Sequence, residues 1–97
     1  MKRASNDENR AEMARETALL ALGYLAGEEE RLNRFLALTG LDRSKVADLL
    51  EENGFHLAIL DHLAGDETLL VDFANENGLR PEAIGAARRA LGGGEPL

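Results

Sequence analysis

A repeat is the feature that most constrains how this chain folds. The stretch 25–41 reads LAGEEERLNRFLALTGL, and the stretch 63–79 reads LAGDETLLVDFANENGL. Matching residues recur at one period of 38: Leu25 and Leu63, Ala26 and Ala64, Gly27 and Gly65, Glu29 and Glu67, Leu32 and Leu70, Phe35 and Phe73, Gly40 and Gly78, Leu41 and Leu79, with Leu19 and Leu57, Leu22 and Leu60, and Val46 and Ile84 outside them. A fixed period with one pattern of apolar residues and turns predicts a structural unit that is used twice.

The apolar residues recur at helical spacing, and no segment alternates as a half-buried strand does. We therefore predict an all-α fold, a compact bundle of about six short helices built as two three-helix repeats with a pseudo-twofold relation. A short solenoid is the alternative arrangement. One domain should cover 7–92, with repeat units at about 14–53 and 54–91, a disordered tail at 1–6 and a loose C-terminus at 93–97.

Local signals place the helix ends and the core. The first helix should begin near Asn6, where Ser5 and Glu8 form a capping-box pattern, and Gly40 and Gly78 should close the second and fifth helices. Asp42 and Asp66 should be N-caps, and Tyr24 should be partly buried with its hydroxyl near water. We expect a third helix over 42–53 and core positions at Leu19, Leu22, Leu25, Leu32, Phe35, Leu36, Thr39, Val46, Leu49, Leu50, Phe55, Ile59, Leu60, Leu63, Leu70, Phe73, Ala74, Ile84, Ala87 and Leu91.

Charge and composition narrow the possible partners. The net charge of −7 disfavours phosphate backbones and anionic membranes. With no cysteine, the chain has no disulfide, thiol nucleophile or cysteine-ligated zinc. The basic and polar N-terminus is not followed by the apolar segment that is typical of a signal peptide. The longest apolar run, Ala18–Ala26, is too short to span a bilayer. We expect a soluble cytoplasmic protein that binds no membrane.

One pattern is typical of a helix-turn-helix motif that binds DNA. Ala74, Gly78 and Ile84 place a small residue, a turn glycine and an apolar residue at the motif's spacing, followed by Arg88 and Arg89. Leu36, Gly40 and Val46 match less well because Leu36 is large. Any tightly turned helix pair needs the same residues, and Arg88 and Arg89 lie late in a helix whose start usually reads the bases. DNA binding is therefore the alternative hypothesis.

The remaining chemistry-bearing residues form no recognisable site. His56 and His62 are six residues apart on one helix, whereas metal pairs prefer a spacing of three or four, so solvated or partly buried histidines are expected. The acidic runs Glu28–Glu30 and Asp66–Glu67 suit helix starts. Phe35 and Phe73 are expected to pack in the core, although they could also floor a ligand cavity between the repeats. We predict no catalytic, cofactor-binding or metal-binding residue and no cofactor.

The segment LALGYLAGEEERLNRFLALTGLD, with Asp72–Phe73–Ala74 and GLRPEAIGAARRAL after it, resembles the bacterial domain-of-unknown-function family 3572. The resemblance covers about 12–91. It implies a compact, cytoplasmic, all-helical domain, mainly of alphaproteobacteria, and it brings no activity or catalytic residue.

Size, acidity and helical grooves favour a non-enzymatic protein–protein interaction module, an adaptor or a regulator, whose partner is another protein. A small enzyme is a further alternative, and a homodimer is possible.

Overall fold

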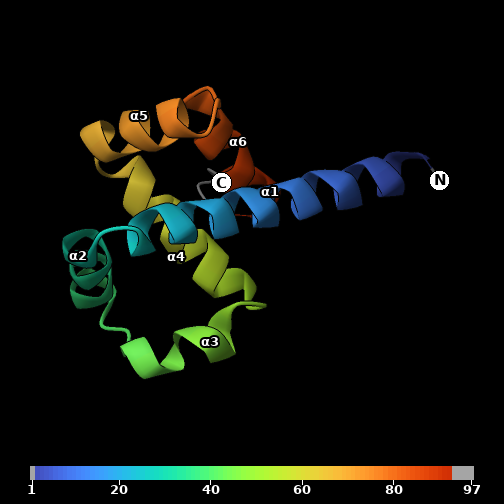
Figure 1. Ribbon diagram of the computed structural model, residues 1–97. Coiled ribbons are helices and arrows are strands. Elements are labelled where there is room, and N and C mark those ends of the chain that lie inside the picture. Colours follow the sequence, from blue (N-terminus) through green and yellow to red (C-terminus); the bar gives the residue numbers. More distant parts are fainter. Residues whose placement is uncertain (1, 93–97) are drawn as a thin grey trace.

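Within residues 2–92 the chain forms six α-helices and one short 3-10 helix (Figure 1). The computed structural model describes the backbone of residues 2–92 and the side chains of residues 8–92. The elements are α1 (Lys2–Ala26), α2 (Glu29–Thr39), the turn η1 (Arg43–Lys45), α3 (Val46–Leu49), α4 (Asn53–Ala64), α5 (Glu67–Glu76) and α6 (Glu82–Ala90). This described range contains no strand, so the predicted all-α class is confirmed.

The structure describes only part of the two predicted tails. α1 begins at Lys2, before the expected start near Asn6, and the side chains of the predicted tail 1–6 are outside the described residues. The predicted loose C-terminus 93–97 is outside them as well.

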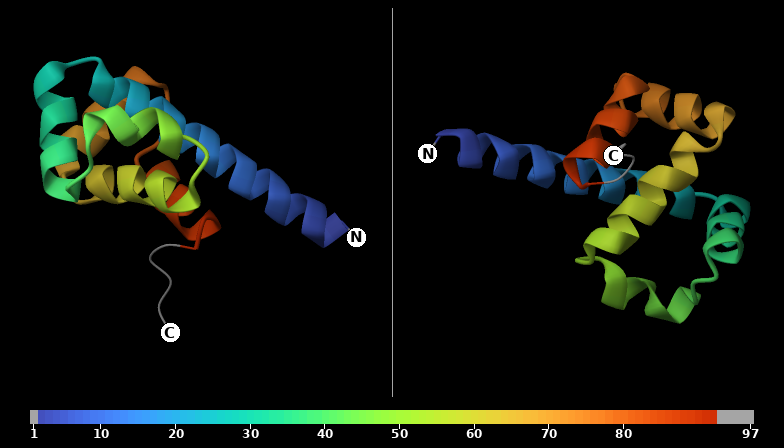
Figure 2. Two further views of the ribbon diagram at one scale, coloured as in Figure 1. Left: turned by 90° about the horizontal axis from the view of Figure 1, so that it is seen from below. Right: turned by 180° about the vertical axis from the view of Figure 1, so that it is seen from behind.

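α1 is the central element of the fold. It packs most extensively against α4 and α6, and α2 covers its C-terminal end. In Figure 1, α5 and α6 lie on one side of α1 and α3 on the other, while α4 crosses it. The views in Figure 2 show that the N-terminal half of α1 projects beyond the body of the molecule.

The face of α1 that enters the core is made of small residues. Ala14, Ala18 and Ala21 are buried together with Leu25, whereas Leu19 is 41% exposed and Leu22 is partly buried. The predicted core role of Leu19 is therefore wrong. Alanines on the inner face let α4 and α6 approach α1 closely, so Leu19 and Leu20 lie on its outer side while Leu25 is buried near its C-terminal end.

The glycine turns are as predicted. Gly40 (φ 74°) and Gly78 (φ 64°) adopt the left-handed conformation that glycine takes without a steric penalty. Beyond each glycine, the N–H of Leu41 donates to the carbonyl of Leu36 at 3.1 Å, and the N–H of Leu79 donates to Ala74 at 2.8 Å. These bonds satisfy carbonyls that a helix end leaves free.

The third helix differs from the prediction. Instead of one helix over 42–53, the chain forms η1 and the four-residue α3, and α4 already begins at Asn53. Asp42 caps the turn as expected, accepting the N–H of Ser44 at 3.1 Å. Neither element has a buried residue, and the predicted core residue Leu50 is exposed. Val46 and Leu49 are only partly buried against the core, so packing gives little support to a longer helix.

The C-terminal half follows the prediction closely. Asp66 caps α5 by accepting the N–H of Leu69 at 3.2 Å, and Phe73 and Ala74 are buried. Inward-facing residues of α4 and α6 are also buried, as predicted: Phe55, Ile59, Leu60, Leu63, Ile84, Ala87 and Leu91. In α2, Phe35 and Leu36 are buried, but Thr39 is exposed and its hydroxyl donates to the carbonyl of Phe35 at 2.8 Å, which corrects its predicted core role.

The two halves make similar aromatic contacts at the centre of the fold, but their third elements pack differently. The Tyr24 ring contacts Phe73 at 5.5 Å between centroids, and His62, 38 residues after Tyr24, contacts Phe35 at 5.2 Å. The third elements diverge, because α6 packs against α1 and α4 whereas α3 has its main contacts with η1. The internal repeat and its pseudo-twofold relation therefore stay a prediction.

We predict that Phe35→Ala and Phe73→Ala each lower the free energy of unfolding by about 3–5 kcal/mol, since both rings are fully buried. Urea unfolding monitored by circular dichroism measures this. Leu38→Ala, at a position that is 66% exposed, is the control and should change stability by less than about 0.5 kcal/mol. Clearly unequal losses at the two phenylalanines would contradict equivalent roles in the core.

Candidate interaction groove

An open apolar groove of about 260 Å³ runs between α1 and α6. α1 contributes Arg10, Met13, Ala14 and Thr17, and the other wall is formed by Leu79, Ala83, Ala86, Ala87 and Ala90. Its surface is mostly carbon, with Arg10 and Thr17 as the polar side chains of the lining. Such a surface is suited to packing against apolar side chains.

The shape of the groove follows from the two faces of α6. Its inner face carries the large buried residues Ile84 and Leu91. Its outer face carries alanines at 83, 86 and 90, spaced three or four residues apart, which places them in one row. Because alanine side chains are short, the wall is low and the backbone of α6 is accessible to another helix.

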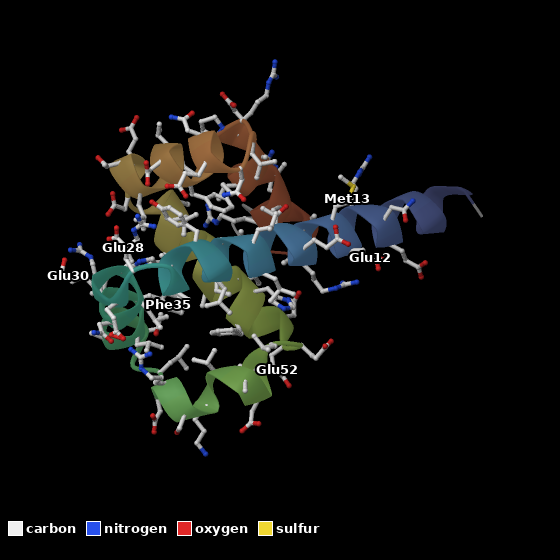
Figure 3. The ribbon with its side chains drawn as sticks, viewed as in Figure 1. Glu12, Met13, Glu28, Glu30, Phe35 and Glu52 are labelled. Carbon is white, nitrogen blue, oxygen red and sulfur yellow. The ribbon has the colours of Figure 1, made fainter. Side chains whose placement is uncertain are left out.

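Met13 is the most prominent apolar side chain at this groove. It lies on the projecting half of α1 and is 66% exposed (Figure 3). Methionine is unbranched and flexible, and it is frequent at surfaces that bind helices. It lies at the rim of the groove, where its side chain is accessible.

A smaller apolar cleft of about 190 Å³ lies between α2, α3 and α4. Leu41 and Leu49 line it, and 38 residues later Leu79 and Ala87 line the α1–α6 groove. Phe55 also lines the cleft, at the position that corresponds to Thr17 in the larger groove. A phenylalanine fills more space than a threonine, which is consistent with the smaller volume.

Tyr24 joins α1, α2 and α5 in a polar cluster away from the groove. It is 8% exposed, and its hydroxyl donates to Asp72 Oδ2 at 2.6 Å. Arg31 donates to the carbonyl of Tyr24 at 3.0 Å, lies 4.0 Å from the ring centroid and pairs with Glu28 at 3.3 Å. Burial raises the pKa of Tyr24 to about 12, and the hydrogen bond to Asp72 adds to the rise. The hydroxyl is thus paired with a carboxylate, whereas we predicted it near water.

The two histidines are buried or partly buried among other residues of the protein. His56 is fully buried, deeper than predicted, and its Nε2 lies 2.7 Å from the carbonyl of Leu50, to which it donates, while Nδ1 has no hydrogen-bond partner. His62 is partly buried against the ring of Phe35. Burial lowers the pKa of His62, with Arg34 acting in the same direction and Asp66 opposing it. Phe35 and Phe73 are both in the core and lie in none of the apolar clefts described above.

The residues of the helix-turn-helix hypothesis adopt the geometry expected of a tight turn. Ala74 and Ile84 are buried on either side of the left-handed Gly78. Arg88 Nε contacts Asp61 Oδ1 at 2.6 Å, whereas Arg89 is exposed. The positive charge of Arg88 is thus already paired with a carboxylate of α4.

The acidic run Glu28–Glu30 lies at the start of α2, and the acidic residues of α1 lie elsewhere on the surface. Glu28 and Glu30 are at the start of α2, far along the surface from Glu12 (Figure 3). Within the described part of the chain, no group of three or more histidine, cysteine or acidic side chains is placed to hold a metal ion. None of the described helices combines the length and the apolar character that a membrane span needs.

These observations define a small all-α domain that carries an open apolar groove beside its central helix. The chain belongs to the family described as "Protein of unknown function (DUF3572)", which matches residues 11–94. Comparison with curated proteins and with solved structures gives no match. The predicted resemblance to this family is confirmed.

Sequence reasoning missed the groove, although its signal is visible in the sequence. Ala83, Ala86 and Ala90 recur at helical spacing with no large residue among them, beside the predicted core residues Ile84, Ala87 and Leu91. Such a row predicts a helix face that another helix can approach. The second wall could not be found this way, because only the packing of α6 against α1 brings Met13 beside the alanines.

We predict that Tyr24 ionises near pH 12 in the folded chain, compared with about 10 for an unburied tyrosine. Because the folded-state pKa lies above the unfolded one, this group lowers stability as the pH rises from about 10 through about 12. The chain has one tyrosine, so phenolate absorbance reports it directly. Asp72→Ala should move the midpoint towards 10, and a wild-type midpoint near 10 would contradict the buried hydroxyl.

Proposed function

We propose that this chain is a non-enzymatic, cytoplasmic protein–protein interaction module, an adaptor or a regulator, that receives a helix of its partner in the α1–α6 groove. The observation that carries the proposal is the open groove formed by the alanine row of α6 and Met13 of α1. Recognition of an amphipathic helix by an apolar groove is a recurrent mode of protein binding.

The dimensions of the groove are suited to a short helical segment. From Ala83 to Ala90, α6 rises about 10 Å, which corresponds to roughly two turns of a partner helix. A partner with large apolar side chains at spacings of three, four and seven residues would place them over the alanines. Helices that meet through alanines can pack at the short end of the usual distances between helix axes.

The lining also supports a role in binding over a role in catalysis. The side chains at the groove are alanine, leucine and methionine, with one arginine and one threonine. Proton transfer between a side chain and a substrate needs groups with a suitable pKa within hydrogen-bond reach of the reacting atom. Methyl groups and a thioether supply van der Waals contact instead.

The decisive variant is Ala86→Arg, which places a long charged side chain on the exposed wall of the groove. Affinity capture from the native cell lysate should recover a stoichiometric partner with the wild type and lose it by at least about tenfold with Ala86→Arg, because apolar contacts at the centre of an interface dominate binding. Leu38→Arg is the control, since Leu38 is an exposed apolar residue on α2, outside the groove.

Circular dichroism should show that both variants are folded. Undiminished capture by Ala86→Arg would place the binding site elsewhere on the molecule. Turnover of a metabolite by the purified chain without any partner would overturn the non-enzymatic role.

DNA binding through the α5–α6 turn is the second candidate, and the turn geometry at Gly78 is what favours it. It predicts salt-sensitive binding to duplex DNA that Arg88→Ala combined with Arg89→Ala weakens, since each phosphate contact contributes to the salt dependence. A mobility-shift assay at low salt measures this. Because Arg88 is engaged by Asp61, Asp61→Ala is a useful companion and should strengthen binding if Arg88 contacts DNA.

A further inference from the structure

The projecting half of α1 has little support from the body of the protein, since Ala11 is its one partly buried residue among those whose side chains are described. Between Glu8 and Met13 no side chain is fully buried, and the first fully buried side chain among the described residues is Ala14. Figures 1 and 2 show this half extending past α6. A short isolated helix is marginal in water, and stability normally comes from packing of its apolar face. Among the described residues of this half, Met13 is the large apolar side chain that could pack against another surface.

The groove lies directly beside this projecting half. α1 itself forms one wall, so the projecting half cannot fill its own groove. The same half of a second copy can, because it is a helix longer than the two turns that the groove accommodates. If each copy inserts its α1 into the groove of the other, one surface is used twice, which is the arrangement of a twofold symmetric interface.

Charge complementarity favours this occupant. Glu8, Glu12 and Glu16 recur every four residues, so they form an acidic stripe along one side of α1. On α6, Arg88 is already paired with Asp61, so Arg89 supplies the exposed positive charge beside the groove, and Glu82 lies two turns before it. Arg89 is exposed, and it lies three residues after Ala86 at the edge of the alanine row. An α1 helix that docks with Met13 over the alanines brings the nearest residue of its acidic stripe, Glu16, towards Arg89.

We propose that the α1–α6 groove binds the projecting half of α1 from a second copy of this chain, forming a symmetric dimer. Met13 of each copy packs on the alanine row of the other, and Glu16 pairs with Arg89. This inference rests on the proposed function, since it names the helix that the groove receives.

Sedimentation of the purified chain over roughly 1 μM to 1 mM, a range that spans weak and moderate affinities, should show a monomer–dimer equilibrium. Met13→Lys should weaken it by at least about tenfold, as loss of a central apolar contact does. Leu38→Lys is the matched control, because Leu38 and Met13 are equally exposed, and it should leave the equilibrium unchanged. Circular dichroism of each variant shows whether the fold is retained.

The charge pair gives a second, independent test. Glu16→Arg and Arg89→Glu should each weaken the dimer, and the double variant should restore it, because the two charges are then exchanged. A wild type that is monomeric at every concentration would overturn the inference, as would a double variant that stays as weak as the single ones. If the chain is monomeric while Ala86→Arg still abolishes capture of another protein, the second-copy inference fails and the proposed function stands.

Discussion

The structure depends on the close contact of α1 with α4 and α6 across the small residues Ala14, Ala18 and Ala21. These side chains are buried, and the largest clusters of contacts in the molecule join α1 to these two helices. Short side chains bring helix backbones near one another, so the cohesion comes from many atoms in van der Waals contact. The aromatic residues Phe35 and Phe73 then fill the space towards α2 and α5.

This constraint also explains why the two halves of the chain differ. In the second half, Ile84 of α6 and Leu91, just after its C-terminal end, are both buried in the core. These contacts hold α6 against the body of the protein. In the first half the corresponding positions are Val46 and Asn53; Val46 is partly buried and Asn53 is exposed. Asn53 instead donates its side-chain amide to the carbonyl of Leu91 at 3.2 Å, so a polar bond stands where the second half has an apolar contact. The short η1 and α3 follow from that loss of buried area.

The same packing of α6 against α1 forms the groove. α6 presents Ile84 to the core and a row of alanines to the groove, so the side that faces the groove is apolar but nearly flat. α1 extends past this flat surface and adds Met13 to its rim. A central helix that is longer than the body it holds together thus creates both a groove and a projecting helix on one surface.

The sequence by itself determined the helical class, the glycine turns at 40 and 78, the cap at Asp66 and the core positions of the second half. These follow from local rules, because helix spacing, left-handed glycines and capping side chains act within a few residues. Only the tertiary structure decided which face of α1 is buried, how short the third element is, and where the groove lies. The apolar segment of α1 offers several faces of similar hydrophobicity, so the choice between leucines and alanines rests on how closely other helices can approach. That distance is a property of the packed helices together and cannot be read from any one of them.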